Sequence, residues 1–257
     1  VYADLTGVIF LNPMHGYGGG SEEKYLTADE YLSGNVREKL EWAKRSAELY
    51  PEDYTAHVQA LERVQPVDLT ASEIAVRLGA TWLPTEVIDQ FIYELFGTSP
   101  RSQRMIRSHY SQHTGAWNIE SKFADRGNVK AENTYGTTRV NGYKIIEETL
   151  NLRDLRIFDY VEDEHGNRVP ILNKKETAIA QGKQQLIKQA FQDWIWKDPA
   201  RRERLTRLYN DKFNSTRPRE YDGSHLNFVG INPEITLRPH QVNAIAHILY
   251  GGNTLLA

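Results

Sequence analysis

Arginine and lysine side chains gather in two stretches of this 257-residue chain. Residues 101–144 hold 8 Lys and Arg against 3 Asp and Glu, and residues 201–219 hold 7 against 2. Cations at this density can neutralise the phosphates of a nucleic acid, although a solvated protein surface has the same composition. The candidates for phosphate contact are Arg101, Arg104, Arg107, Arg201, Arg202, Arg204 and Arg207.

Aromatic residues are interleaved with the first of these stretches. Tyr110, Trp117 and Phe123 could stack on bases beside the arginines. They could also form the core of a small sheet, because they fall on two segments with strand character, 105–110 and 117–123. The pattern favours the sheet core for the three rings and leaves the arginines open to either interpretation.

A different chemistry is suggested by residues 236–257, which read TLRPHQVNAIAHILYGGNTLLA. Pro239 suits the first turn of a helix, two glycines end that helix, and residues 253–257 predict the start of a buried strand. Strand, glycine-rich loop and helix is the order in which a phosphate-binding loop is presented. On spacing alone, Gln241 is a polar residue near a helix start. The apolar residues expected to form one buried face are Val242, Ala244, Ile245, Ile248, Leu249 and Tyr250.

Complete active sites of the common kinds are absent from the sequence. It has no G-x-x-x-x-G-K-[ST] loop and no DEAD-like acidic box, so ATP hydrolysis lacks its lysine and its magnesium carboxylate. His109 and His113 are four residues apart but lack the glutamate of a zinc-protease helix. The glycine-rich loop at 15–21 has no lysine and is interpreted as a linker. We therefore predict no catalytic residue and no metal site within this chain.

Several long segments resemble one family. They are EYLSGNVREKLEWA (30–43), QPVDLTASEIAVRLGATWLP (65–84), NTYGTTRVNGYKIIEETLNLRDLRIFD (133–159), LNKKETAIAQGKQQLIKQAF (172–191) and FNSTRPREYDGSHL (213–226). From about Gly7 onward the chain resembles the region that precedes the motor core in large helicase–DNA methylase proteins of bacterial plasmids, conjugative elements and phages. Residues 236–257 resemble the entry to the core of superfamily-two, DEAD/DEAH-like ATPases of the Swi/Snf type.

This resemblance implies a function for the parent protein. Residues matching Arg238, Pro239 and Gln241 would form a Q motif, in which Gln241 reads adenine and Arg238 supports the loop. ATP with Mg would be the cofactor of the full-length protein, with none expected for this segment alone. The phosphate-binding loop is expected beyond Ala257, and a chain that begins with Val1 is consistent with a fragment of something longer.

The resemblance also implies partners and a location. DNA and the rest of the same polypeptide, namely an ATPase core and a methylase, are the expected partners, in the bacterial cytoplasm and without membrane association. The segment would then be an accessory region that holds or orients DNA beside a motor. The alternative is a structural spacer or protein-docking module between the methylase and the motor.

Composition is compatible with this location. The chain has no cysteine, which excludes disulfides and Cys-ligated metal sites, and it has no signal peptide or membrane-length apolar run. The net charge of −3 is unevenly spread, because residues 1–100 hold 7 Lys and Arg against 16 Asp and Glu while the remainder holds 24 against 18. The acidic first part is a poor candidate for DNA contact.

The predicted fold is α+β and predominantly helical, with small antiparallel strand elements. Two capping boxes, Thr27 with Glu30 and Thr70 with Glu73, predict helix starts, and Pro84 opens another helix. The expected segments are a strand and Gly-rich linker (1–26), an acidic helical unit (27–100), a basic mixed α+β unit (101–172), a helical hairpin with connector (173–235) and the start of a RecA-like ATPase core (236–257). In the hairpin, the expected buried face of the long helix is Ile179, Leu186, Ile187, Ala190, Phe191, Trp194 and Ile195.

Overall fold

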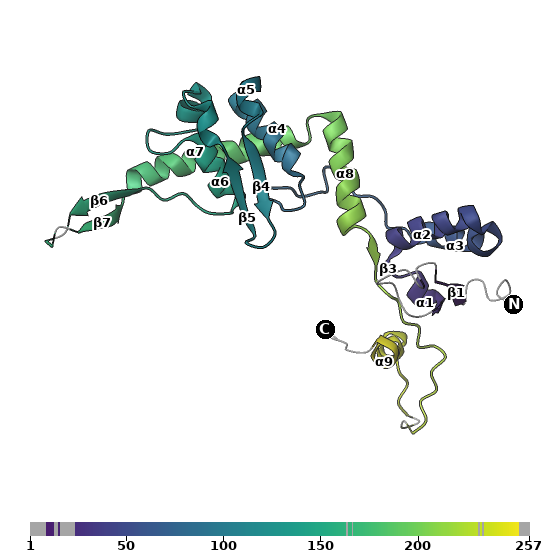
Figure 1. The fold of residues 1–257 in the computed structure, drawn as a ribbon. Helices are drawn as coiled ribbons and strands as arrows, with labels where there is room; N and C mark the ends of the chain where they lie inside the picture. Colours follow the sequence, from purple (N-terminus) through teal and green to yellow (C-terminus); the bar gives the residue numbers. More distant parts are fainter. Residues whose placement is uncertain are drawn as a thin grey trace. The chain divides into compact units, whose positions relative to one another are not determined.

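A computed structural model of the chain shows an α+β fold that is about 51% helical (Figure 1). It describes residues 9–12, 15, 24–162, 164–165, 167–230, 232 and 234–251. The chain forms two compact units. Unit 1 combines the residues up to 68 with those from 210 onward, and unit 2 comprises residues 69–209. The predicted α+β class with short antiparallel strand pairs is confirmed.

Unit 1 is built from short helices and two small antiparallel ladders. The first ladder pairs β1 (Ile9–Leu11) with β2 (Tyr25–Thr27), and the second pairs β3 (Gly34–Asn35) with β8 (Thr216–Arg217). The helices are α1 (Ala28–Tyr31), α2 (Val36–Leu49), α3 (Pro51–Arg63) and α9 (Pro239–Gly251). The second ladder joins the early part of the chain to its late part, and next to it the amide of Val36 donates to the carbonyl of Ser215 at 3.0 Å.

The core of unit 1 is aromatic. The rings of Phe10 and Tyr31 stack at 4.6 Å, and the imidazole of His57 meets Phe10 edge-on at 5.0 Å. Phe10, Tyr31 and Leu61 are fully buried. The helices α2 and α3 supply the aliphatic part of this core, in which Val36, Leu40 and Ala43 of α2 are buried at helical spacing.

Unit 2 holds the larger core. Its elements are α4 (Thr85–Phe96), α5 (Pro100–Gln103), β4 (Arg107–Ser111), β5 (Ala116–Glu120), the 3₁₀ turn η2 (Lys122–Asp125), the π-helical turn η3 (Lys130–Thr134), α6 (Gly142–Leu150), β6 (Phe158–Glu162), β7 (Arg168–Leu172), α7 (Lys174–Ile195) and α8 (Pro199–Phe213). Strands β4 and β5 pair as one hairpin and β6 and β7 as another. The final residues of α8 belong to unit 1.

Helices α4 and α7 supply much of the unit 2 core. The helix predicted to open at Pro84 is confirmed as α4, and Phe91 on its buried face meets Phe191 of α7 edge-to-face at 5.1 Å. The buried face predicted for α7 is right for Ile187, Phe191 and Ile195 and wrong for Ile179 and Leu186, which are exposed. The stripe instead continues through smaller and polar residues, Thr177, Ala180 and Gln184, which apolar spacing alone does not reveal.

The helix predicted to follow Thr70 does not form. The Glu73 carboxylate accepts from the amide of Thr70 at 2.8 Å and from its hydroxyl at 2.7 Å, but these bonds close a turn only. Beyond it, Ile74, Val76 and Leu78 are buried while the residues between them are exposed. This alternation has a period of two, which is the periodicity of an extended chain. The segment therefore buries its apolar side chains without forming a helix.

The two units also divide the chain differently from the predicted segments. The acidic helical unit expected over 27–100 is split, because α2 and α3 share the core of unit 1 whereas α4 packs in unit 2. In the last segment, Ala246 is buried but Ile248, Leu249 and Tyr250 are about half exposed, which corrects the expected face of α9. Residues 252–257 and the loop at 16–21 lie outside the described residues. Among the described helices, none has the length and apolar character needed to cross a membrane.

Candidate functional site

Three short segments of unit 2 meet around α5. The side chain of Ser99 caps α5, and the hydroxyl of Ser102 donates to the carbonyl of Ala124 in η2 at 2.9 Å. The Asn128 amide donates to the carbonyl of Phe96 at 3.1 Å, which ties the approach to η3 onto the end of α4. These bonds bring residues 99–104 and 122–130 onto a shared surface.

We call this area the arginine–phenylalanine surface, and it comprises Arg101, Arg104, Phe123, Arg126 and Lys130. All five residues are exposed. Within the described part of the chain, the four cationic side chains make no hydrogen bond or ion pair. The positive charge of this surface is therefore available to an external anion.

The neighbouring acidic side chains are held by the protein itself. The carboxylate of Asp125 accepts from the hydroxyl of Tyr143 and from the side-chain amide of Asn128, both at 2.7 Å. The carboxylate of Glu132 accepts from the backbone amide of Gly127 at 2.8 Å. Burial is the main cause that raises the pKa of Tyr143 above its ordinary value. Within the described residues, neither carboxylate forms an ion pair with a cation of the arginine–phenylalanine surface.

Phe123 is the aromatic member of this surface, and it is 84% exposed. It borders a cavity of about 220 Å³ whose lining includes two cations, Lys122 and Arg126, and two carboxylates, Asp125 and Glu132. The interpretation as sheet core is correct for Trp117, which is buried, and for Tyr110, whose ring lies 5.1 Å from that of Trp117. For Phe123 it is wrong, because β5 ends at Glu120 and the following residue, Ser121, turns the chain outward at φ +50°.

Arg107 stands next to this surface but has a structural contact of its own. Its guanidinium nitrogen Nη1 donates to the hydroxyl of Tyr93 and to the carbonyl of Gln103. The same nitrogen donates to the carbonyl of the preceding residue, Ile106, at 2.9 Å. Arg107 thereby links α4, α5 and β4, and only the exposed remainder of its guanidinium faces solvent.

The arginines of α8 do not share one environment. Arg202 and Arg204 are exposed, and their side chains have no hydrogen bond or ion pair within the described residues, whereas Arg207 is exposed and interacts with another group. Arg201 is only 6% exposed, and its guanidinium lies 3.5 Å from the centre of the Trp194 ring. Its Nε and Nη2 donate to the carbonyls of Ile195 and Trp194 at 3.0 and 2.7 Å. Arg201 caps the end of α7, so we remove it from the candidates for phosphate contact.

The two residues of the predicted Q motif lie at the start of α9. The side-chain carbonyl of Gln241 accepts from the amide of Arg238 at 2.9 Å, which satisfies a backbone donor that the helix itself cannot pair. Both residues are exposed. This contact is the one expected of a polar residue near a helix start, and the reading of adenine by Gln241 stays a prediction.

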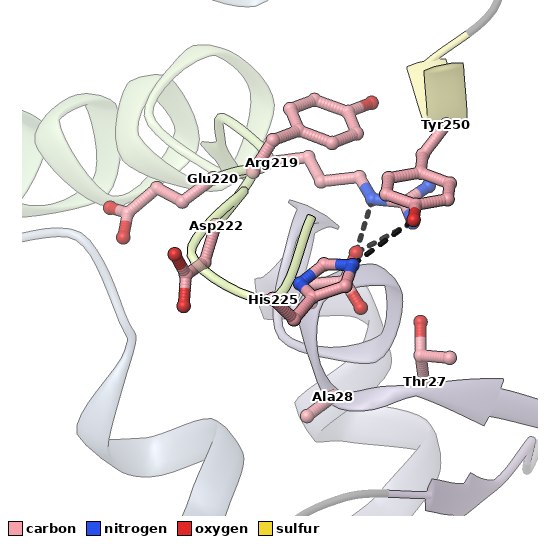
Figure 2. Close-up of a pocket in the computed structure, with 9 residues that line it drawn as sticks. Thr27, Ala28, Arg219, Glu220, Asp222, His225 and Tyr250 are labelled. Atoms are coloured by element: carbon pink, nitrogen blue, oxygen red, sulfur yellow. Dashed lines mark hydrogen bonds and ion pairs between the residues drawn. The ribbon is translucent and has the colours of Figure 1, made fainter. Parts of the chain in front are cut away.

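A larger pocket lies elsewhere in unit 1 (Figure 2). Its volume is about 490 Å³, and its lining comes from the start of α1, from the segment 219–225 and from Tyr250 of α9. Arg219 is paired with the carboxylate of Asp29 at 2.6 Å and with that of Glu30 at 2.9 Å. The side chains of Glu220 and Asp222 add negative charge, so this pocket does not suit a phosphate. Neither Arg238 nor Gln241 is among the residues that line it.

A metal site in this chain would need several histidine, aspartate or glutamate side chains close together. In the part of the chain that the structure describes, no group of three such side chains is placed to hold a metal ion. His225 and Tyr250 both line the unit 1 pocket and are in contact, with Nε2 and the hydroxyl oxygen 3.0 Å apart. We assign no proton-transfer role to this pair, because both residues are exposed.

Comparison with known proteins identifies the family of this chain. No curated protein and no solved structure matches this chain. A family model described as a domain of unknown function, DUF8437, matches residues 77–215, which is more than half of the chain. The matched region contains nearly all of unit 2, including the arginine–phenylalanine surface and α8. The chain belongs to the DUF8437 family.

Proposed function

We propose that this chain is a DNA-contacting accessory region of an ATP-dependent DNA helicase or translocase, and that it is not catalytic by itself. The observation on which the proposal depends is the exposed ring of Phe123 among four cations that have no partner in the described residues. Cations neutralise the DNA backbone while an exposed ring stacks on a base. Arg202 and Arg204 of α8 would extend the contact along the backbone.

The position of Phe123 favours one form of DNA. A ring can stack only on a base whose face is not already covered by a neighbouring base pair. We therefore expect single-stranded or frayed DNA to bind more tightly than an intact duplex. The cavity of about 220 Å³ beside Phe123 offers room for part of such a base.

The remaining parts of the proposal come from the sequence resemblance. The parent protein would be a Swi/Snf-type helicase–methylase of a mobile element, plasmid or phage, in the bacterial cytoplasm. Its RecA-like core would bind ATP and Mg, with Gln241 reading adenine and Arg238 beside it. The side-chain amide nitrogen of Gln241, Nε2, makes no hydrogen bond in the described part of the chain, so it remains available as a donor to a ligand.

The substitution Phe123→Ala tests the stacking contact. We expect it to weaken binding of a single-stranded oligonucleotide by about tenfold, because base–aromatic stacking is worth about 1–3 kcal/mol. Fluorescence anisotropy with a labelled oligonucleotide measures this change. Tyr50→Ala removes an aromatic ring that is also exposed but lies in unit 1, and it should leave the affinity unchanged. Equal affinities for the wild type and Phe123→Ala would rule out the stacking role.

A second function is favoured by the β6–β7 hairpin, which extends from the rest of unit 2 (Figure 1). Its apolar side chains are 38–69% exposed, namely Phe158, Tyr160, Val161, Val169, Ile171 and Leu172. A two-stranded ladder with solvent on both faces is marginally stable alone. These exposed side chains suit a protein-docking module that joins a methylase to a motor.

The two functions differ in what the hairpin should do. If the chain is a docking module, Tyr160→Ser with Ile171→Ser should abolish its co-elution with a separately expressed ATPase core, and the wild-type chain should bind no DNA at low salt. If the chain is a DNA-contacting region, the same double variant should keep its DNA affinity.

A further inference from the structure

A cavity of about 260 Å³ in unit 2 is lined by three cationic side chains. Arg77 comes from the extended segment before α4, Arg153 follows α6, and Lys188 lies on α7. The cavity is separate from the arginine–phenylalanine surface, since the two share no residue. All three cations fall within the residues that the family model matches.

The arrangement of α7 directs Lys188 toward this cavity. Gln184, Lys188 and Gln192 are spaced by four residues and therefore lie on one face of the helix. The side chain of Gln184 is buried, and this residue is 1% exposed. Its side-chain amide donates to the carbonyl of Arg153 at 2.8 Å and to the hydroxyl of Thr149 at 3.1 Å. The amide of Gln192 donates to the carbonyl of Val76 at 2.6 Å. Lys188 is thus held between the two segments that supply Arg153 and Arg77.

The backbone of these segments is closely packed. A Cβ on Gly79 would approach the carbonyl oxygen of Leu150 to 2.4 Å, so the chain after Arg77 lies directly against the end of α6. Two residues after the end of α6, Leu152 has φ +57°, and the backbone amide of Arg153 donates back to the carbonyl of Glu148 at 2.9 Å. Arg77 and Arg153 therefore extend from backbone whose position is fixed.

The charge of the cavity is not balanced by internal partners. Within the described residues, the side chains of Arg77, Arg153 and Lys188 make no hydrogen bond or ion pair. Asp154 is the acidic residue among those that line the cavity, so the lining has a net positive charge. Two guanidinium groups and one ammonium group line the same small cavity, and these are the donors that bind a phosphate group.

We propose that this cavity is a phosphate-binding pocket, in which Arg77, Arg153 and Lys188 donate to the oxygens of a single phosphate group. The phosphate belongs either to a DNA backbone or to a small phosphate compound. The pocket does not depend on stacking by Phe123, so it extends the proposed function and can be tested apart from it.

The first experiment uses inorganic phosphate as the probe. The full chain is titrated with phosphate by isothermal calorimetry at constant ionic strength, with chloride as the balancing anion. We expect saturable binding, and we expect Lys188→Gln and Arg153→Gln each to weaken it by about tenfold, because each removes a charge-assisted hydrogen bond. The matched control is Lys175→Gln, which neutralises an exposed lysine on the first turn of the same helix and should change nothing.

Two results would contradict phosphate binding in this cavity. One is the absence of saturable phosphate binding to the wild type. The other is a Lys188→Gln variant that binds phosphate as well as the wild type, whatever its melting temperature, because the cations would then serve only to stabilise the end of α6. Retention of phosphate binding by Phe123→Ala, together with loss of its DNA binding, would separate this pocket from the stacking surface.

A competition experiment identifies the source of the phosphate. An oligonucleotide without terminal phosphates is added to the phosphate-saturated chain. Displacement of phosphate supports a pocket for the DNA backbone. Simultaneous binding of both supports a pocket for a small phosphate compound.

Discussion

Arg201 and Arg202 are neighbours in the sequence and have different structural roles. Arg201 is buried and caps the carbonyls at the end of α7, whereas Arg202 is exposed. Charge counts place both in the same basic stretch. What separates them is the direction in which each side chain leaves α8, and this direction depends on the packing of α8 against α7 and not on residue type. A charge reversal at Arg201 would therefore test the stability of unit 2 and not its contact with DNA.

His57 also has an environment that its sequence position does not reveal. Its ring lies in the aromatic core of unit 1, with Nδ1 3.2 Å from the hydroxyl of Tyr31. Burial lowers its pKa to about 4, from 6.5 in an exposed chain, although Asp53 partly opposes this shift. In the folded chain, His57 is therefore neutral over most of the pH range between about 4 and 6.5.

This pKa predicts how stability depends on pH. Between pH 6.5 and about 4 the unfolded chain binds more protons at His57 than the folded chain does, so acidification destabilises unit 1 within this window. Urea unfolding near pH 7 and near pH 5 measures the loss. His57→Gln, which cannot take up this proton, should lose less stability over the same interval. An equal loss in both proteins would show that other groups dominate the acid response.

At the scale of elements, apolar periodicity predicts most helices correctly. The side chains of Asn173 and Asp198 cap the starts of α7 and α8, with Asn173 accepting from the backbone amide of Glu176 at 3.0 Å. Prediction fails where tertiary contacts override local signals. The capping box of Thr70 and Glu73 closes only a turn, because the residues after it bury every second side chain against the unit 2 core.

Two glycines of unit 2 give opposite predictions. Gly79 has φ +98° and touches the backbone of Leu150, so Gly79→Ala should destabilise the chain by more than about 1 kcal/mol. Gly182 lies within α7, where an added Cβ would meet no atom within 4 Å, so Gly182→Ala should stabilise the chain by up to about 1 kcal/mol. Urea unfolding of both variants measures these changes. Similar effects of the two substitutions would contradict the packing of Gly79 against α6.

At the scale of the whole molecule, the α+β class is predictable from the sequence but the division into units is not. Unit 1 is discontinuous, because β8 returns to pair with β3 and Arg37 donates to the carbonyl of Asn214 at 2.9 Å. Pairings between such distant residues leave no local signal in composition or periodicity. The basic stretch at 101–144 is recognisable from its charge, whereas the exposure of Phe123 depends on a single turn at Ser121. The cavity around Lys188 draws on three distant segments and could not be predicted from any one of them.

The salt dependence of DNA binding tests the central claim most directly. The full chain and the triple variant Arg101→Gln, Arg104→Gln, Arg126→Gln are titrated with single-stranded DNA over a range of salt concentrations. The control neutralises three exposed cations of unit 1, Lys44, Arg45 and Arg63. We predict a steep loss of wild-type affinity with salt, and a triple-variant slope shallower by about 0.7 for each phosphate that the variant no longer neutralises. The control should match the wild type. Absence of binding at low salt, or equal slopes for all three proteins, would contradict DNA contact by this surface.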